Sequence, residues 1–363
     1  MIAGQDSQKV ILGLFIVVGA VLLLRAPVAL AQGIAIAAPA DVDLTPTTQE
    51  TIDAIKRRAE QILAQRQRAK EVQFSGELSQ GIGFERNPSY SSDHKGDSFV
   101  EDDLYMTLSK KLTPTVTWQG VYSGSYIYYF KLAADTYSSQ TFTPLKLIWR
   151  PDQMWRFDGG IDLTYLWYLY TKYSKTSSYQ EVKPWVGVRQ NLFGTWFHAI
   201  RYQWFLRHYL SASARDGLGK ATLSHREDTR DTLRYELGTT WKDTLFKARY
   251  EWYLNDSNDA RNDFYDAQDN RVTLSISRPL TEKLSALASY SHELRHYAHR
   301  PVSGIAPKKV RYDEIHTWGI SGSYDFNRTW SLNPSFTYTR NNSNDPTAEY
   351  FDWTVSTALT ARF

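Results

Sequence analysis

Charged side chains recur at alternate positions along the middle of the chain. Most of them lie between apolar or aromatic residues, so a strand through this stretch would carry charge on one face and mainly apolar groups on the other. Ionised groups gathered along one wall can select solutes by their charge. The residues of this pattern are Arg201, Arg207, Arg230, Arg234, Glu236, Lys247, Arg249, Glu251, Arg271, Glu293 and Arg295.

Two interpretations of this charged face compete. Facing lipid at the middle of a membrane, each charge would cost about 2–4 kcal/mol, so we expect these side chains to face an aqueous interior. Arginine and glutamate on neighbouring strands could pair there and only brace the wall. Alternatively, a basic arc could favour the passage of anionic solutes or acidic glycans. The residues alone leave both interpretations open.

Catalytic and metal chemistry find little support. His292, His296 and His299 have a spacing that suits a metal on a helix, but on a strand residues four apart stand about 13 Å from each other. Ser291 adjoins His292 as a nucleophile and base might, yet adjacent strand residues point to opposite faces. Nucleophile elbows and phosphate-binding loops are absent from the sequence. We therefore predict no catalytic residue, no metal, no cofactor and no enzyme activity.

The elements that must position the charged residues follow a period of two. From residue 72 onward, short alternating segments rich in Tyr, Trp, Val and Leu are separated by polar or turn-forming residues. We expect strands at 72–85, 99–111, 114–131, 137–150, 154–172, 178–192, 195–210, 226–241, 243–256, 263–278, 283–299, 310–326, 329–342 and 348–363. The fold class is thus all-β, with about fourteen strands.

The connections between these strands alternate in length. Tight turns such as Lys242–Asp243 contain the residues that turns require, whereas the intervening connections, such as 86–98 and 211–225, are longer and polar. This alternation is typical of an up-and-down antiparallel barrel in an outer membrane, with short turns in the periplasm and long loops outside. An even number of strands places both ends of the barrel in the periplasm.

The chain ends on a strictly alternating strand. Leu359, Ala361 and Phe363 share its apolar face, together with Trp353 and Val355. A soluble protein rarely leaves such a strand as an exposed edge, whereas a closed barrel removes the edge. The terminal phenylalanine resembles the signal that the barrel-assembly machinery reads in outer-membrane barrels, which implies that machinery as a partner.

Composition excludes several alternatives. The chain holds 42 basic and 39 acidic residues, and this near balance argues against a nucleic-acid partner. It contains no Cys, which excludes disulfides and thiol catalysis. Its aromatic residues gather close to the turns, where amphipathic rings favour the level of the lipid headgroups. We expect a girdle there of Trp118, Trp149, Trp155, Trp185, Trp196, Trp241, Trp318 and Trp330.

The N-terminus predicts export. Residues 1–31 have a basic residue, an apolar run of about fifteen residues and a small-x-small site at Ala29 and Ala31, which indicate a cleaved signal peptide. Residues 32–46 are expected to be a linker and residues 47–71 an amphipathic helix. This helix could be a solvated leader, a plug in the lumen, or a surface that binds a periplasmic protein partner.

Residues 72–363 resemble a porin-like β-barrel of the bacterial outer membrane. The ending, with Asn341–Asp345 followed by Tyr350–Asp352 and the last strand, is similar to surface lipoprotein assembly modifiers and exopolysaccharide-associated barrels. This resemblance implies contact with membrane lipid and lipopolysaccharide. It also implies a channel or transporter for a hydrophilic solute or polymer, and the basic residues favour an anionic one. The alternative is an anchor or assembly component of a polysaccharide or lipoprotein export complex, acting through 47–71. Assembly modifiers carry a helical-repeat domain before the barrel, where this chain has one short predicted helix.

Overall fold

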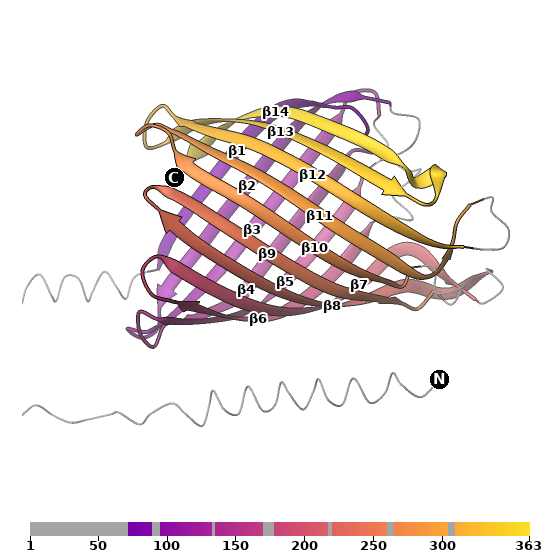
Figure 1. The fold of residues 1–363 in the computed structure, drawn as a ribbon, viewed down its shortest axis with the longest axis horizontal. Coiled ribbons are helices and arrows are strands. Elements are labelled where there is room, and N and C mark those ends of the chain that lie inside the picture. The colour runs from indigo at the N-terminus through magenta and orange to yellow at the C-terminus, as the bar shows by residue number, and fades with distance from the viewer. Residues whose placement is uncertain are drawn as a thin grey trace, which may run out of the picture. The chain divides into compact units, whose positions relative to one another are not determined.

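Fourteen antiparallel strands form one closed barrel (Figure 1). The computed structural model describes residues 72–88, 95–132, 135–169, 178–216, 220–259, 265–303 and 309–363. Each strand pairs with the next one in the chain, and the last pairs with the first, so the predicted up-and-down barrel is confirmed. The predicted signal peptide, linker and helix (1–31, 32–46 and 47–71) lie outside the described residues. Within the described part, no helix is long and apolar enough to cross a membrane.

The strand bounds follow the alternating segments of the sequence closely. The strands are β1 (Gln73–Glu85), β2 (Asp97–Lys111), β3 (Val116–Tyr129), β4 (Tyr137–Trp149), β5 (Trp155–Tyr168), β6 (Tyr179–Asn191), β7 (Trp196–Arg215), β8 (Ala221–Trp241), β9 (Thr244–Ser257), β10 (Ala267–Pro279), β11 (Leu284–Pro301), β12 (Val310–Asp325), β13 (Trp330–Ser343) and β14 (Tyr350–Arg362).

Alternation sorts the side chains of every strand between two faces. On β1, Phe74, Leu78 and Ile82 are all more than half exposed. They are four residues apart, so all three point to the outer face. The exposed apolar residues of the other strands continue this face around the barrel. Burying such a band in acyl chains stabilises the barrel, because the apolar surface would otherwise contact water.

The seam between β1 and β14 closes the barrel. Its register runs from Glu77 opposite Arg362 to Glu85 opposite Thr354. Beyond the last strand residue, the Gly76 amide donates to the Phe363 carbonyl at 2.8 Å and the Phe363 amide donates back at 3.0 Å. A Cβ at Gly76 would lie 2.5 Å from the Phe363 ring, so the ring packs directly against the backbone of Gly76.

Tight turns gather at one end of the barrel and longer connections at the other (Figure 1). In the two-residue turn between β8 and β9, Lys242 has a φ of 42°, the left-handed value that hairpin turns need. The predicted loop 211–225 is wrong in its extent, because β7 continues to Arg215 and β8 begins at Ala221. These stretches consist of small and polar residues, with Leu223 as their only large apolar side chain, so their alternation is weaker than that of strands inside the apolar band.

The expected aromatic girdle is only partly right. Trp196, Trp241 and Trp330 are exposed beside the tight turns, as the headgroup level requires. Trp185 instead points inward, is 5% exposed, and donates from Nε1 to Asp162 Oδ1 at 3.2 Å. The strand register places it on the face of the charged residues, since Trp185 lies opposite Gln203 of β7.

Two of the longer connections are joined at the other end of the barrel. Asp345, before the short 3₁₀ helix Pro346–Ala348, accepts hydrogen bonds from the backbone and hydroxyl of Ser303 at 3.2 and 3.0 Å and from Thr347 Oγ1 at 2.7 Å. Burial opposes ionisation of this carboxyl, but the hydrogen bonds from Thr347 and Ser303 outweigh it and hold its pKa below the ordinary value.

Candidate functional site

The charged residues singled out in the sequence all lie on the inner face of β7 to β11. They alternate with exposed apolar side chains such as Leu233 and Tyr235 on β8 and Tyr250 on β9, which belong to the outer face. Antiparallel register then brings inner residues of neighbouring strands directly opposite one another: Arg234 faces Glu251, and Glu236 faces Arg249. The residues therefore form one continuous wall.

Most of this wall is a ladder of ion pairs. Arg234 Nη2 lies 2.6 Å from Glu251 Oε1, and the other oxygen of Glu251 lies 3.9 Å from Arg271 Nη1. Arg271 donates from Nε to Glu293 Oε2 at 2.7 Å. Four strands are thus joined through alternating charges, as pairing across neighbouring strands predicts.

The ladder ends in a buried cluster on β10 and β11. Arg295 contacts Glu293 at 2.6 Å and Asp269 at 2.8 Å, and both carboxylates are almost fully buried. Tyr253 donates to Glu293 Oε1 at 3.1 Å. Asp269 was not among the predicted residues, although its alternation with Asn270 on β10 places it on the same face as Arg271. The bracing interpretation therefore describes this half of the wall.

A second group of pairs lies on β6 to β9. Arg249 Nη2 contacts Glu236 Oε2 at 3.1 Å, and Arg207 Nη2 contacts the buried Glu181 Oε2 at 2.8 Å. Lys183 lies 3.0 Å from the other oxygen of Glu181. Glu181 was also missed in the sequence, because β6 carries few charges and does not stand out by itself.

Aromatic rings separate the arginines along the wall. The Arg207 guanidinium lies 3.9 Å from the Tyr179 ring centroid, and that of Arg230 lies 4.8 Å from Phe205 and 4.4 Å from Tyr253. Planar guanidinium groups stack on such rings and gain cation–π attraction. The sequence could have placed these rings on the inner face, since they alternate with the outward residues. Only the strand register shows which arginine contacts which ring.

One part of the wall holds more positive than negative charge. A recess of about 320 Å³ is lined by five arginines, two carboxylates and the short residues between them: Arg156, Asp158, Gly187, Val188, Arg189, Ala199, Ile200, Arg201, Arg234, Glu236 and Arg249. Three of the arginines have close carboxylate partners, namely Asp158, Glu251 and Glu236. The remaining two arginines give the recess its excess of positive charge.

Arg189 and Arg201 are the least compensated of these arginines. Arg201 reaches Asp158 only at 4.0 Å and lies over the Trp185 ring at 4.2 Å. Arg189 lies 3.7 Å over the Phe197 ring, and no carboxylate of the described residues is within ion-pair distance of it. Gly187 lies directly opposite Arg201 and two residues before Arg189, and Asp158 Oδ1 packs against it, since a Cβ at Gly187 would lie 2.6 Å from that oxygen. The recess therefore holds two arginines without a close carboxylate partner.

Lys247 stands apart from both groups. It lies opposite Gly238 and Ser275, near the β8–β9 turn, and it forms no ion pair with any part of the chain that the structure describes. Of the predicted residues, the recess thus includes Arg201, Arg234, Glu236 and Arg249, and the ladder includes Arg234, Glu251, Arg271, Glu293 and Arg295. Arg207 and Arg230 lie on the same wall among aromatic rings.

Comparison with known proteins gives likeness in structure only. No protein-family model matches the chain, and no curated protein matches it. Among solved structures, the OmpT outer membrane protein of Vibrio cholerae is similar with a TM-score of 0.47 and 9% identity, over 81% of this chain and 99% of that one. The toluene transporter TodX of P. putida gives 0.41 and 9%, over 80% and 90%. An anion-selective porin from Comamonas acidovorans gives 0.41 and 8%, over 81% and 99%. These likenesses assign neither a family nor a cargo.

The barrel itself defines the class of protein. A closed sheet without edges, an outer face of exposed apolar side chains and an inner face of charged ones are the properties of a strand-built membrane protein. The chain is an outer-membrane β-barrel, and its outer band is in contact with membrane lipid.

Proposed function

We propose that the protein is a channel for hydrophilic anionic solutes, and that the recess around Arg189 and Arg201 is where they bind during passage. The observation that carries this proposal is the imbalance of charge there: two of the five arginines, Arg189 and Arg201, lack a close carboxylate partner, whereas the arginines of the neighbouring ladder are paired with Glu251, Glu293 and Asp269. A solute that passes along the wall would meet two weakly compensated arginines side by side at the recess.

The chemistry of the recess supports an anionic cargo. A guanidinium presents a planar fork of donors that matches carboxylate and phosphate groups. The rings of Phe197 and Trp185 hold Arg189 and Arg201 in place, so less entropy is lost when an anion binds. Fourteen strands also enclose a wider interior than the eight-stranded barrels whose lumen is filled by side chains.

The test is a measurement of ion selectivity in planar bilayers. Purified protein in a salt gradient is expected to conduct and to show a reversal potential of the sign that anion preference gives. The double variant Arg189→Gln with Arg201→Gln should lower the anion-to-cation permeability ratio severalfold, because the uncompensated charges are removed.

Arg278→Gln is the control for the loss of an arginine charge outside the recess, since it removes one such charge from an exposed position at the turn end of β10. Its selectivity should equal that of the unmodified protein. Absence of any current, or preference for cations, would contradict the proposal. Lipopolysaccharide contact and a periplasmic partner bound through 47–71 remain further proposals, and co-purification with and without that segment tests the second.

A further inference from the structure

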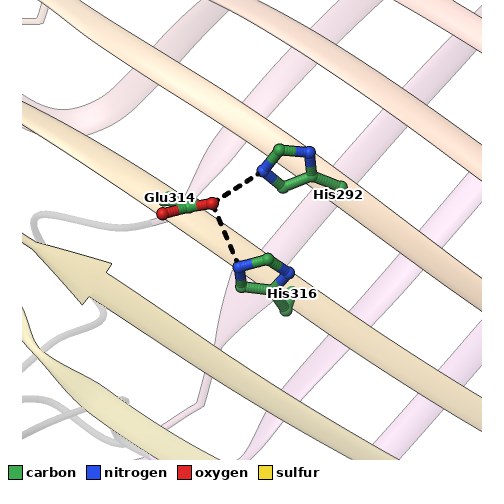
Figure 2. A group of neighbouring side chains, drawn as sticks. All are labelled: His292, Glu314 and His316. Carbon is green, nitrogen blue, oxygen red and sulfur yellow. Dashed lines mark hydrogen bonds and ion pairs between the residues drawn. The ribbon is translucent and has the colours of Figure 1, made fainter.

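Two histidines and a glutamate converge on the outer face of the barrel, on the opposite side of the wall from the charged residues. His292 of β11 and His316 of β12 are directly opposite each other in the strand register, and their rings stack with centroids 4.8 Å apart and planes 12° apart. Glu314 lies two residues before His316 and therefore on the same face. Its Oε1 lies 3.0 Å from His292 Nε2 and 3.2 Å from His316 Nε2 (Figure 2).

The neighbours show that this cluster faces outward. Tyr290 and Leu294 flank His292 on the same side of β11, and Trp318 and Ile320 continue the side of His316 on β12. Leu294, Trp318 and Ile320 are exposed, as residues of the outer apolar face are. Ser289 and Ser291 point the other way, so the serine–histidine pair considered in the sequence does not form.

The cluster lies near the outer edge of the apolar band. Counted from the tight turns, β10–β11 for His292 and β12–β13 for His316, each histidine occupies the fifth outward position on its strand. Each step of two residues advances about 5 Å along the membrane normal on a tilted strand, so the cluster stands about 20 Å above the first outward position. This height is close to that of the outer headgroups, since the band is about 25 Å tall.

We propose that His292, Glu314 and His316 bind a divalent transition metal ion, with Zn²⁺ as the best fit. Two imidazole nitrogens and one carboxylate oxygen are a ligand set that zinc uses when its fourth position is left open. With bonds of about 2 Å, tetrahedral ligands stand about 3.3 Å apart. The two nitrogen–oxygen separations are 3.0 and 3.2 Å, and all three ligand atoms lie within 4.8 Å of one another. The two nitrogen–oxygen separations thus already fit a bound ion, and the two histidine nitrogens, at most 4.8 Å apart, must approach to about 3.3 Å when it binds.

A further contact prepares His316 for this role. Its Nδ1 lies 2.9 Å from the Tyr290 hydroxyl. In the tautomer that donates from Nδ1 to Tyr290, the Nε2 lone pair is free for the metal, and the ring is held in orientation. Metal-bound histidines commonly have such a partner on the second nitrogen.

Another histidine pair on the barrel lacks this convergence. His208 and His225 also stack, at 5.2 Å, and His208 Nδ1 lies 3.1 Å from Glu227. However, His225 Nδ1 faces the Tyr209 carbonyl at 2.9 Å instead of the carboxylate. Stacking and a nearby glutamate are therefore common to both pairs, and the shared oxygen distinguishes His292 and His316. The sequence could not reveal this site, because the two histidines are 24 residues apart and meet only through strand register.

The experiment is metal titration of the full chain folded in detergent. Calorimetry with Zn²⁺ is expected to show one site, and Cu²⁺ in its place should give an electron paramagnetic resonance spectrum with splitting from two nitrogens. His292→Ala and His316→Ala should each weaken Zn²⁺ binding at least about tenfold and reduce the nitrogen splitting. Glu314→Gln should weaken binding while both nitrogens remain.

His208→Ala is the matched control and should leave the affinity unchanged, because it removes the same side chain from the other stacked pair. Retarded or heat-modifiable migration in electrophoresis confirms that each variant is folded. No saturable Zn²⁺ binding, a Cu²⁺ spectrum without nitrogen splitting, or full affinity in His292→Ala and His316→Ala would overturn the proposal. Ion conductance is independent of this site, so the channel proposal does not depend on the result.

Discussion

Arg271 on β10 lies directly opposite Glu293 on β11, and its Nε donates to Glu293 Oε2 at 2.7 Å. The same glutamate accepts from Arg295 and Tyr253, so one carboxylate holds three donors on the inner wall. Glu293 is only 4% exposed, so little water could reach these donors if the carboxylate were removed. Glu293 is therefore the central residue of the ladder.

Glu293→Ala is expected to lower the free energy of unfolding by about 2–3 kcal/mol, because two guanidiniums lose their shared carboxylate at a largely buried position. Urea unfolding in lipid vesicles, followed by tryptophan fluorescence, measures this change. Glu227→Ala is the control: Glu227 is exposed and, among the described residues, forms an ion pair with His208 alone, so the loss should stay within about 0.5 kcal/mol. Equal stability of both variants would show that the ladder does not brace the wall.

Gly187→Val should block the recess without unfolding the barrel. The new side chain would displace Asp158 and occupy the space between Arg189 and Arg201. We expect anion selectivity to fall severalfold in bilayer recordings, while the β-sheet spectrum is unchanged. Gly159→Ala introduces a Cβ on the outer face, with its nearest neighbour at 3.3 Å, and should leave selectivity intact. A recess with no role in passage would give the same selectivity in both variants.

Phe363→Ala should reduce the amount of folded barrel in the outer membrane severalfold. We propose that Phe363, with Ala361 and Leu359, is read by the barrel-assembly machinery, and the Phe363 ring is 59% exposed and 5.8 Å from Phe74 at the closing seam. Quantitative electrophoresis of membrane fractions measures the effect. Phe326→Ala, an exposed ring at another tight turn, should have little effect. Normal levels of folded Phe363→Ala barrel would contradict the proposal that the assembly machinery reads Phe363.

The contact between Asp345 and Ser303 should depend on pH. Because the pKa of Asp345 is held below its ordinary value, its contribution to stability is present above about pH 4, the unfolded value, and is lost as the pH falls below it. Hydrogen exchange of the Ser303 amide, which donates to Asp345 at 3.2 Å, should therefore be protected at pH 7 and lose relative protection under acid. Asp345→Asn should remove the pH dependence of this protection. If the dependence persists in the variant, another group is its cause.

Much of the fold was predictable from the sequence because its signal is local. A strand that separates lipid from an aqueous interior must alternate apolar and polar residues, and this pattern gave the fourteen strands, their faces and the closing strand at Phe363. The pattern weakens above the apolar band, where the strands are built mostly of small and polar residues, and there the extension of β7 and β8 beyond the predicted ends was missed.

The sequence by itself determined that Arg201, Arg234 and Glu251 face inward, because charge on the lipid side is costly. Only the tertiary structure decided their partners: Arg234 meets Glu251, whereas Arg201 meets Trp185 and remains weakly compensated. It likewise decided that His292 meets His316. The physical reason is that alternation fixes the face of a residue within its own strand, but the register between strands, set by turns and closure of the whole barrel, fixes which residues come together.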